Sequence, residues 1–363
     1  MTDTTLVDTK TNTQNNTITL YPSNWLYNAG VIGLMRILNE PGDPVEKFIR
    51  TDGSISLSFT KNTNQIFCKW EELSPKSKKG TSIAYGWKDA YYANQTEDSI
   101  KKRIDFLCKI NINGKKGKVK FSCSFCTDKV QIKKSDATFL NQAFGNILLG
   151  SEKSFCNMYW NNSARDYVCP KCEFILMCHH LALTRLSDGS EIFINAPSFQ
   201  VMWHLNQFAQ KMYGSASGEE SRDKREILAM SVIEYATKIQ TTLGKWIGMN
   251  IEIINKYKVK KDNNWVNVIE HFNLPYSNIL ILSDRQIATL LSDIGEFRIL
   301  NIVLNQEYGK LLDIGYRLLR IGNKDNEFKN DYFYLDKNKK NPNETAYKIF
   351  QLHALIEEKI KKI

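Results

Sequence analysis

Apolar residues recur at helical spacing in several separate segments of the chain. In the first part this spacing predicts helices over residues 25–38, 89–107, 137–149, 174–186 and 199–213. Alternating apolar and polar residues predict strands over residues 17–21, 55–59 and 191–195. Phe67 and Trp70 are expected to continue this sheet.

The predicted helix at residues 25–38 has a defined start and a face suited to close packing. Ser23 or Asn24 is the expected N-cap, because its short polar side chain can accept a hydrogen bond from a free backbone N–H. The small residues Ala29, Gly30 and Gly33 permit a very close approach to another backbone.

The second part of the chain begins after the clearest linker, Gly214-Ser-Ala-Ser-Gly218. The pattern then predicts a helix over 222–243, strands over 247–259 and 279–282, and mostly helix from residue 284 to a last helix over 343–362. We therefore predict an α+β fold. Residues 1–16 form a disordered lead-in, 17–213 a mixed α/β domain, 214–221 a linker, and 222–363 a mainly helical domain with a short sheet.

Charge and aromatic content favour a polyanionic partner. The 363 residues carry a formal net charge of +10, together with 16 Tyr, 18 Phe and 7 Trp. This combination is typical of nucleic-acid binding, although a solvated surface rich in lysine and asparagine explains the net charge equally well. The clustering of lysines in predicted loops favours binding.

The sequence gives no sign of membrane insertion or export. It has no run of about 18 apolar residues, which a spanning helix requires, and its first residues lack the apolar core of a signal peptide. Eight cysteines in such a chain indicate reduced thiols and metal binding rather than disulfides. We therefore expect a cytoplasmic protein with no membrane partner.

Four of the cysteines form two CxxC pairs, Cys123/Cys126 and Cys169/Cys172. Two such turns can complete a tetrahedral shell of four thiolates around zinc, and a closed shell indicates a structural rather than a catalytic metal. The gap of 42 residues between the pairs is longer than the roughly 12–20 of a compact zinc ribbon, which suggests an inserted segment. The alternative is four unrelated core cysteines.

Other residues near the second pair leave part of this interpretation open. Cys178, His179 or His180 could replace one ligand, although these residues are expected on the helix over 174–186, with Cys178 buried and one histidine partly exposed. The remaining thiols are expected to be ordinary buried cysteines. They are Cys68, Cys108 and Cys156.

Two lysine-rich loops, residues 74–80 and 113–120, supply the candidate nucleic-acid contacts. Their lysines would contact phosphates and two nearby aromatic side chains would stack on bases. The alternative is that the lysines are simply solvated and the aromatic side chains belong to the core. The candidates are Lys76, Lys78, Lys79, Tyr85, Trp87, Lys115, Lys116, Lys118 and Lys120.

Motifs for the common enzymatic chemistries are missing from the sequence. There is no GxxxxGK[ST], no GxGxxG after a strand and no HExxH. His179-His180 is the sole concentrated histidine site, and adjacent helical residues point about 100° apart, so the pair is poorly placed to grip one metal. We therefore expect a protein that is not an enzyme.

The segment Leu20-Tyr-Pro-Ser-Asn-Trp-Leu-Tyr-Asn-Ala-Gly-Val-Ile-Gly-Leu34 resembles the N-terminal signature of a CRISPR-associated family. That family is the Cst-type large subunit of the subtype I-B interference complex, Cascade. The cysteine pairs in mid-chain and the helical C-terminal half agree with it. Members often end in a four-helix bundle, whereas only about two to four helices are expected here after residue 284.

The resemblance implies a non-catalytic subunit with many partners. Such subunits bind guide RNA and the backbone and small subunits of Cascade, inspect target duplex DNA for a short flanking motif, support R-loop formation and recruit a helicase-nuclease. It leads us to expect Asn24, Trp25 and Asn28 near the guide-RNA end or a backbone subunit. A free-standing zinc-containing regulator that binds nucleic acid, and a metal-dependent enzyme using His179 and His180, are the competing interpretations.

Overall fold

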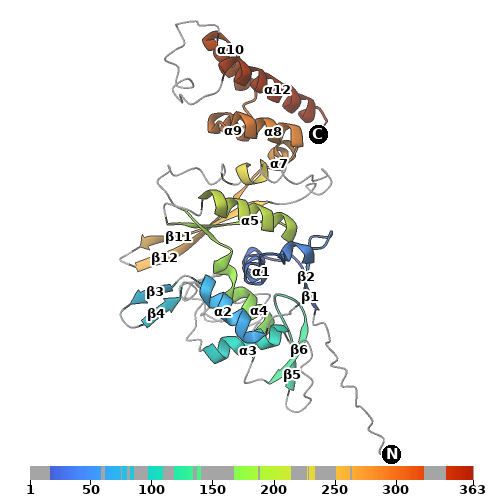
Figure 1. Ribbon diagram of the computed structural model, residues 1–363, viewed down its shortest axis with the longest axis vertical. Helices are drawn as coiled ribbons and strands as arrows, with labels where there is room; N and C mark the ends of the chain where they lie inside the picture. Colours follow the sequence, from blue (N-terminus) through green and yellow to red (C-terminus); the bar gives the residue numbers. More distant parts are fainter. Residues whose placement is uncertain are drawn as a thin grey trace, which may run out of the picture. The chain divides into compact units, whose positions relative to one another are not determined.

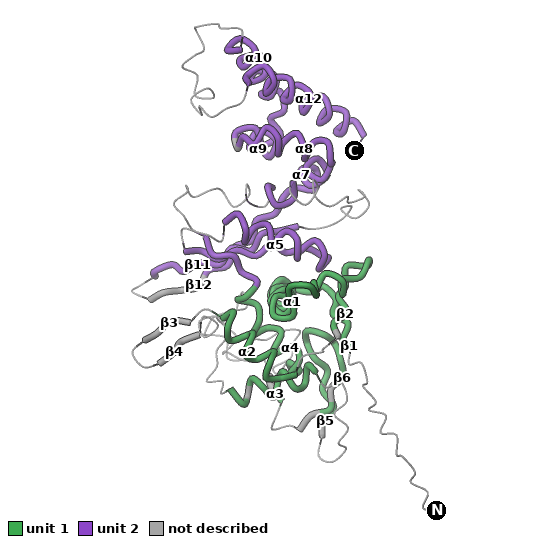
Figure 2. Tube along the Cα trace, viewed as in Figure 1, with its two compact units in different colours: residues 1–181 green, residues 182–363 purple. Residues whose placement is uncertain are grey.

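The computed structural model describes residues 17–58, 62–74, 76–79, 82–85, 97–108, 118–133, 137–139, 167–186, 189–213, 227, 229–233, 251–261, 264–322 and 341–362. The chain divides into two compact units, residues 1–181 and 182–363 (Figure 2). Both contain helices and strands, and the helices of the C-terminal part follow one another from residue 276 (Figure 1). The expected α+β class, with a four-cysteine cluster in the first half, is therefore confirmed.

Unit 1 is built around the apolar helix α1 (Trp25–Leu38), which is buried on almost every side. Asn24, one of the two N-caps that the sequence offered, caps it by accepting a hydrogen bond from the Tyr27 N–H at 3.0 Å. The remaining elements are β1 (Thr17–Leu20), η1 (Val45–Phe48), β2 (Ile55–Ser58), α2 (Thr63–Leu73), β3 (Lys76–Lys79), β4 (Ser82–Tyr85), α3 (Glu97–Cys108), β5 (Lys118–Ser122), β6 (Lys129–Lys133), β7 (Thr138–Phe139), β8 (Tyr167–Val168), α4 (Pro170–Met177) and η5 (His179–Leu181). Helix α1 lies against four other helical segments, α2, α4 and the short 3-10 helices η1 and η5.

Two glycines of α1 touch the backbone of α4 and of the residue that follows it. A Cβ on Gly30 would lie 2.3 Å from the Ile175 carbonyl oxygen, and one on Gly33 would lie 2.0 Å from the Cys178 carbonyl oxygen. Neither position can hold a side chain without moving a backbone segment. The close approach that the sequence predicted is thus made to α4.

Unit 2 contains a four-stranded antiparallel sheet in the order β12-β11-β10-β9. Helix α5 packs on β10 and β9. Four helices follow residue 284 in the described part of this unit, and α12 lies against α10 and α8. The elements are β9 (Thr184–Arg185), β10 (Glu191–Asn195), α5 (Phe199–Tyr213), β11 (Glu252–Lys261), β12 (Asn264–Asn273), α7 (Tyr276–Leu282), α8 (Arg285–Ile294), α9 (Phe297–Leu304), α10 (Gly309–Gly322) and α12 (Pro342–Ile360).

The boundary between the units differs from the join expected near residue 214. It falls between Leu181 and Ala182, because β10 pairs with β11 and therefore belongs to the second unit together with α5. The expected lead-in at residues 1–16 and linker at 214–221 lie outside the described residues.

Several local predictions were wrong. Phe67 and Trp70 lie in α2, whose start carries a capping box between Asn62 and Gln65. Residues 279–282, expected as a strand, lie at the end of helix α7. The prediction failed because a short apolar run does not distinguish a strand from a buried helix. The helix expected over 174–186 ends at Met177 and is followed by η5 and β9. A helix was also expected over 137–149, but residues 138–139 form the strand β7.

Candidate metal centre

The first cysteine pair occupies the turn of the β5–β6 hairpin. Lys118 pairs with Lys133 and Ser122 with Lys129, so residues 123–128 connect the strands. The Thr127 N–H donates to the Cys123 carbonyl at 3.0 Å, and the Cys123 N–H donates to the Asp128 carbonyl at 3.0 Å. Thr127 adopts a φ of 60°, the left-handed conformation that lets the chain reverse within these few residues.

The second pair lies at the start of α4. Cys169 is the N-cap, with Pro170 in the first turn, and its Sγ accepts a hydrogen bond from the Cys172 N–H at 3.4 Å. A helix N-terminus carries partial positive charge, which favours thiolates at this place. The two pairs meet because the Cys169 N–H also donates to the Cys123 Sγ at 3.3 Å.

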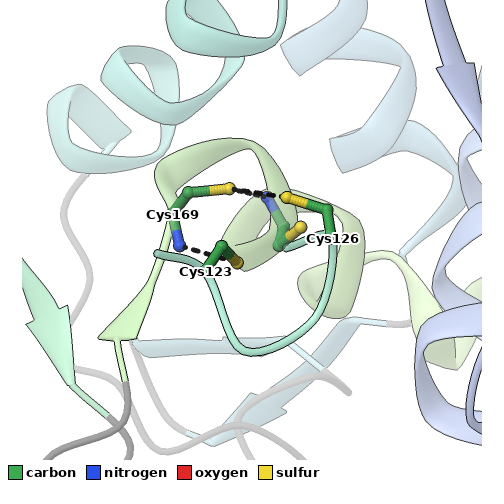
Figure 3. Close-up of side chains that lie close together, drawn as sticks. Cys123, Cys126 and Cys169 are labelled. Carbon is green, nitrogen blue, oxygen red and sulfur yellow. Dashed lines mark hydrogen bonds between the residues drawn. The ribbon is translucent and has the colours of Figure 1, made fainter. Parts of the chain in front are cut away.

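All four Sγ atoms lie within 4.8 Å of one another (Figure 3). The Sγ atoms of Cys126 and Cys169 are 3.7 Å apart, far beyond the roughly 2.05 Å of a disulfide. A tetrahedron with metal–sulfur bonds of about 2.3 Å has edges of about 3.8 Å. The donor set therefore fits a metal ion that prefers four thiolates, and the four cysteines could hold one.

The electrostatics of the cluster also fit a cation. Hydrogen bonds from the other three thiols lower the pKa of Cys123, while hydrogen bonding with neighbouring cysteines raises the pKa values of Cys169 and Cys172. One thiolate thus forms readily and further thiolates form at increasing cost, since like charges would then lie a few ångströms apart. A bound cation would remove that cost.

An ion pair and an aromatic contact lie beside the cluster. Lys171 pairs with Asp128 and so ties the second turn to the first. Burial lowers the pKa of Lys171, but Asp128 and the nearby cysteines outweigh burial and raise it above its usual value. Tyr27 of α1 stacks with Phe125 at 6.3 Å between ring centroids, and burial followed by the cysteine charges raises the Tyr27 pKa.

Helix α4 is fixed on its other side by a buried ion pair. The Arg103 guanidinium of α3 donates to the Glu173 carboxylate at 2.6 Å, and only 2% of the Glu173 side chain is exposed. Neither this pair nor Lys171–Asp128 was foreseen from the sequence. The available signal in the sequence was the presence of two charged residues, Lys171 and Glu173, within and directly after the second CxxC pair.

The cluster contains the four cysteines of the two CxxC pairs, and the alternative ligands Cys178, His179 and His180 are not part of it. Cys178 is fully buried, as expected, and burial raises its pKa. His179 Nδ1 lies 2.6 Å from the Leu176 carbonyl, and His180 Nε2 lies 3.1 Å from the Ser74 hydroxyl. The expectation that the other thiols are buried was wrong for Cys68, which is exposed, and for Cys108, which is half-buried, whereas Cys156 lies outside the described residues.

The candidate nucleic-acid residues fall partly on hairpins rather than loops. Lys76, Lys78 and Lys79 lie on β3, with Tyr85 of β4 opposite Lys76. Lys118 and Lys120 lie on β5, and the Lys120 side chain is exposed. The other three candidates lie outside the described residues. They are Trp87, Lys115 and Lys116.

The candidate partner residues surround the start of α1. Asn24 is exposed and Trp25 is half-buried. Asn28 is buried, and its amide accepts from the Ser23 N–H at 2.7 Å and donates to the Ser23 carbonyl at 2.8 Å. Asn28 therefore holds the preceding turn in place.

Comparison with known proteins gives a family match for the segment that contains the cysteines. Residues 116–184 match the model of a family described as CRISPR-associated protein (Cas_CXXC_CXXC), and this segment contains all four clustered cysteines. No curated protein and no solved structure matches the chain. Within the described residues, no helix has the length and apolarity to cross a bilayer. The match indicates a CRISPR-associated protein.

Proposed function

We propose that the chain is the non-catalytic large subunit of a type I-B Cascade complex. The observation that carries the proposal is the match of residues 116–184 to a CRISPR-associated family, over the segment whose four cysteines cluster. The resemblance of residues 20–34 to a large-subunit signature supports the finer assignment. The net charge of +10 suits a protein that binds guide RNA and target DNA.

In this proposal the protein reads a short motif that flanks the target in duplex DNA. Base pairing of the guide RNA carries the sequence information, and the protein supports R-loop formation and recruits a separate helicase-nuclease. The two basic hairpins supply phosphate contacts through Lys76, Lys78, Lys79, Lys118 and Lys120. Tyr85 and Trp87 stack on bases, and Lys115 and Lys116 extend the second basic segment.

The cysteine cluster holds a structural zinc ion in this proposal. Four thiolates close the tetrahedral shell and leave no open position for substrate, so the metal joins the β5–β6 turn to α4. Helix α1 rests on α4 through Gly30 and Gly33. The zinc thereby fixes the segment from Asn24 to Asn28, which faces the guide-RNA end or a backbone subunit.

A tagged pull-down from the native host tests the assignment. We expect repeat-spacer RNA, several partner subunits and about one zinc ion per chain, determined by RNA sequencing, mass spectrometry and metal analysis. Recovery of the protein alone, or with unrelated nucleic acid to which it binds tightly by itself, would refute the Cascade assignment in favour of a zinc-containing regulator.

A further inference from the structure

The β11–β12 hairpin is longer than the sheet that supports it. Strand β10 pairs only with residues 252–256 of β11, whereas β12 pairs with all ten residues from Glu252 to Lys261. Residues 257–261 and their partners on β12 are thus a two-stranded extension in the described part of the sheet, about 17 Å long at 3.4 Å per residue. Figure 1 shows β11 and β12 as a long paired ribbon.

Charge is distributed unevenly along this hairpin. At its supported end each basic group meets an acid: Lys256 pairs with Glu191 at 3.1 Å, and His271 lies 3.1 Å from the Glu252 carboxylate. The sequence of residues 257–268 holds three lysines against one aspartate. The extension is therefore the positively charged end of the hairpin.

Three neighbouring side chains of the extension are open to solvent, whereas Tyr257 and Val268 at its base are half-buried. Lys258 and Lys260 are exposed, and Val259 between them is 41% exposed. Lysines two residues apart on a strand lie on one face about 6.8 Å apart. The register sets Trp265 opposite Lys260.

We propose that this extension, residues 257–261 of β11 and 264–268 of β12, inserts into the major groove of duplex DNA, with Lys258 and Lys260 contacting phosphates. The B-form major groove, about 12 Å wide, admits a two-stranded β-ribbon. The major groove of duplex RNA is too deep and narrow for side chains to read, which selects DNA over RNA. The inference rests on the proposed function, and it adds to it a DNA-contacting element in the second unit.

Duplex binding by the full-length chain tests the inference. The probe is a fluorescent 30-base-pair DNA of random sequence, with anisotropy measured between about 50 and 200 mM salt. Loss of two phosphate contacts in K258E/K260E should make the slope of log K against log salt shallower by about 1.8. The ratio of wild-type affinity to variant affinity should therefore fall about twelvefold between about 50 and 200 mM salt. K258R/K260R should bind as wild type does.

A matched variant controls for net charge. K310E/K361E makes the same charge change at two exposed lysines of the helical part of unit 2 and should leave the salt slope unchanged. Equal losses in both reversal variants, equal losses on single-stranded DNA or duplex RNA, or no duplex binding by wild type would each overturn the inference. If circular dichroism shows that K258E/K260E is unfolded, K258Q/K260Q replaces it, with the same expected slope.

The failure of this inference is distinguishable from that of the proposed function. If K258E/K260E still recovers guide RNA and partner subunits but binds duplex as wild type does, the ribbon assignment alone fails. If wild type recovers no Cascade components while K258E/K260E loses duplex binding, the ribbon assignment stands and the Cascade assignment fails.

Discussion

Replacing Gly33 of α1 by alanine should destabilise unit 1. The added Cβ would lie 2.0 Å from the Cys178 carbonyl oxygen and 2.8 Å from its carbon, whereas real Cβ contacts stay above 3.0 Å. Helix α1 or the end of α4 must therefore move by about 1 Å. Neither atom belongs to a side chain that could rotate away.

The size of the effect follows from two opposing terms. Overpacking a well-filled interior costs about 1–3 kcal/mol, and a rigid backbone neighbour puts Gly33→Ala at the upper end. Alanine gains about 1 kcal/mol over glycine within a helix. We therefore expect the free energy of unfolding to fall by about 2 kcal/mol.

Urea unfolding followed by circular dichroism measures this change. Gly309→Ala is the matched control, because a Cβ on Gly309 would meet no atom within 4 Å and should leave the protein as stable as wild type or slightly more stable. Gly33→Ala should also weaken metal binding at the four cysteines, since the displaced α4 carries Cys172. If Gly33→Ala proved as stable as Gly309→Ala, the close contact between α1 and α4 would be refuted.

Two further predictions concern α4 and the cysteine cluster. Glu173→Ala removes the buried carboxylate that accepts from the Arg103 guanidinium and should lower the free energy of unfolding by about 3–5 kcal/mol. R103M/E173L, which removes both charges, should lose less, and equal losses in urea unfolding would contradict this reasoning. Neighbouring thiols raise the pKa of Cys169, and a thiol must lose its proton to bind metal, so metal should bind more tightly at higher pH and be released as the pH falls. A chromophoric chelator follows the release, Cys68→Ser should behave as wild type, and retention that is independent of pH would contradict the four-thiolate site.

Local patterns predicted the elements that have their own start signals and a full period. The helices at residues 25–38 and 199–213 and the strand at 191–195 have the predicted bounds, because each combines a regular apolar period with a clear end. The run at 279–282 was too short to show a period. The unit boundary depends on the pairing of β10 with β11, and Asn195 and Glu252 are 57 residues apart in sequence.

The sequence was sufficient to predict the four ligands of the metal site but not the residues that surround them. CxxC spacing fixes two sulfurs on one turn, so the four cysteines followed from the sequence. Their surroundings come from distant segments, since Tyr27 on α1 and Arg103 on α3 reach the cluster and α4 only through tertiary packing. No local pattern records such contacts.

The packing of α1 on α4 and η5 also governs the order in which the protein can fold during synthesis. The Arg36 guanidinium of α1 donates to the Leu181 carbonyl, and the two residues are 145 positions apart. At a synthesis rate of about 5–20 residues per second, roughly 7–30 s pass between the two positions. Through that interval the most apolar helix of unit 1 has left the ribosome before the backbone that receives its glycines exists. Nascent chains should therefore engage chaperones that bind apolar segments from the first helix until the second cysteine pair emerges.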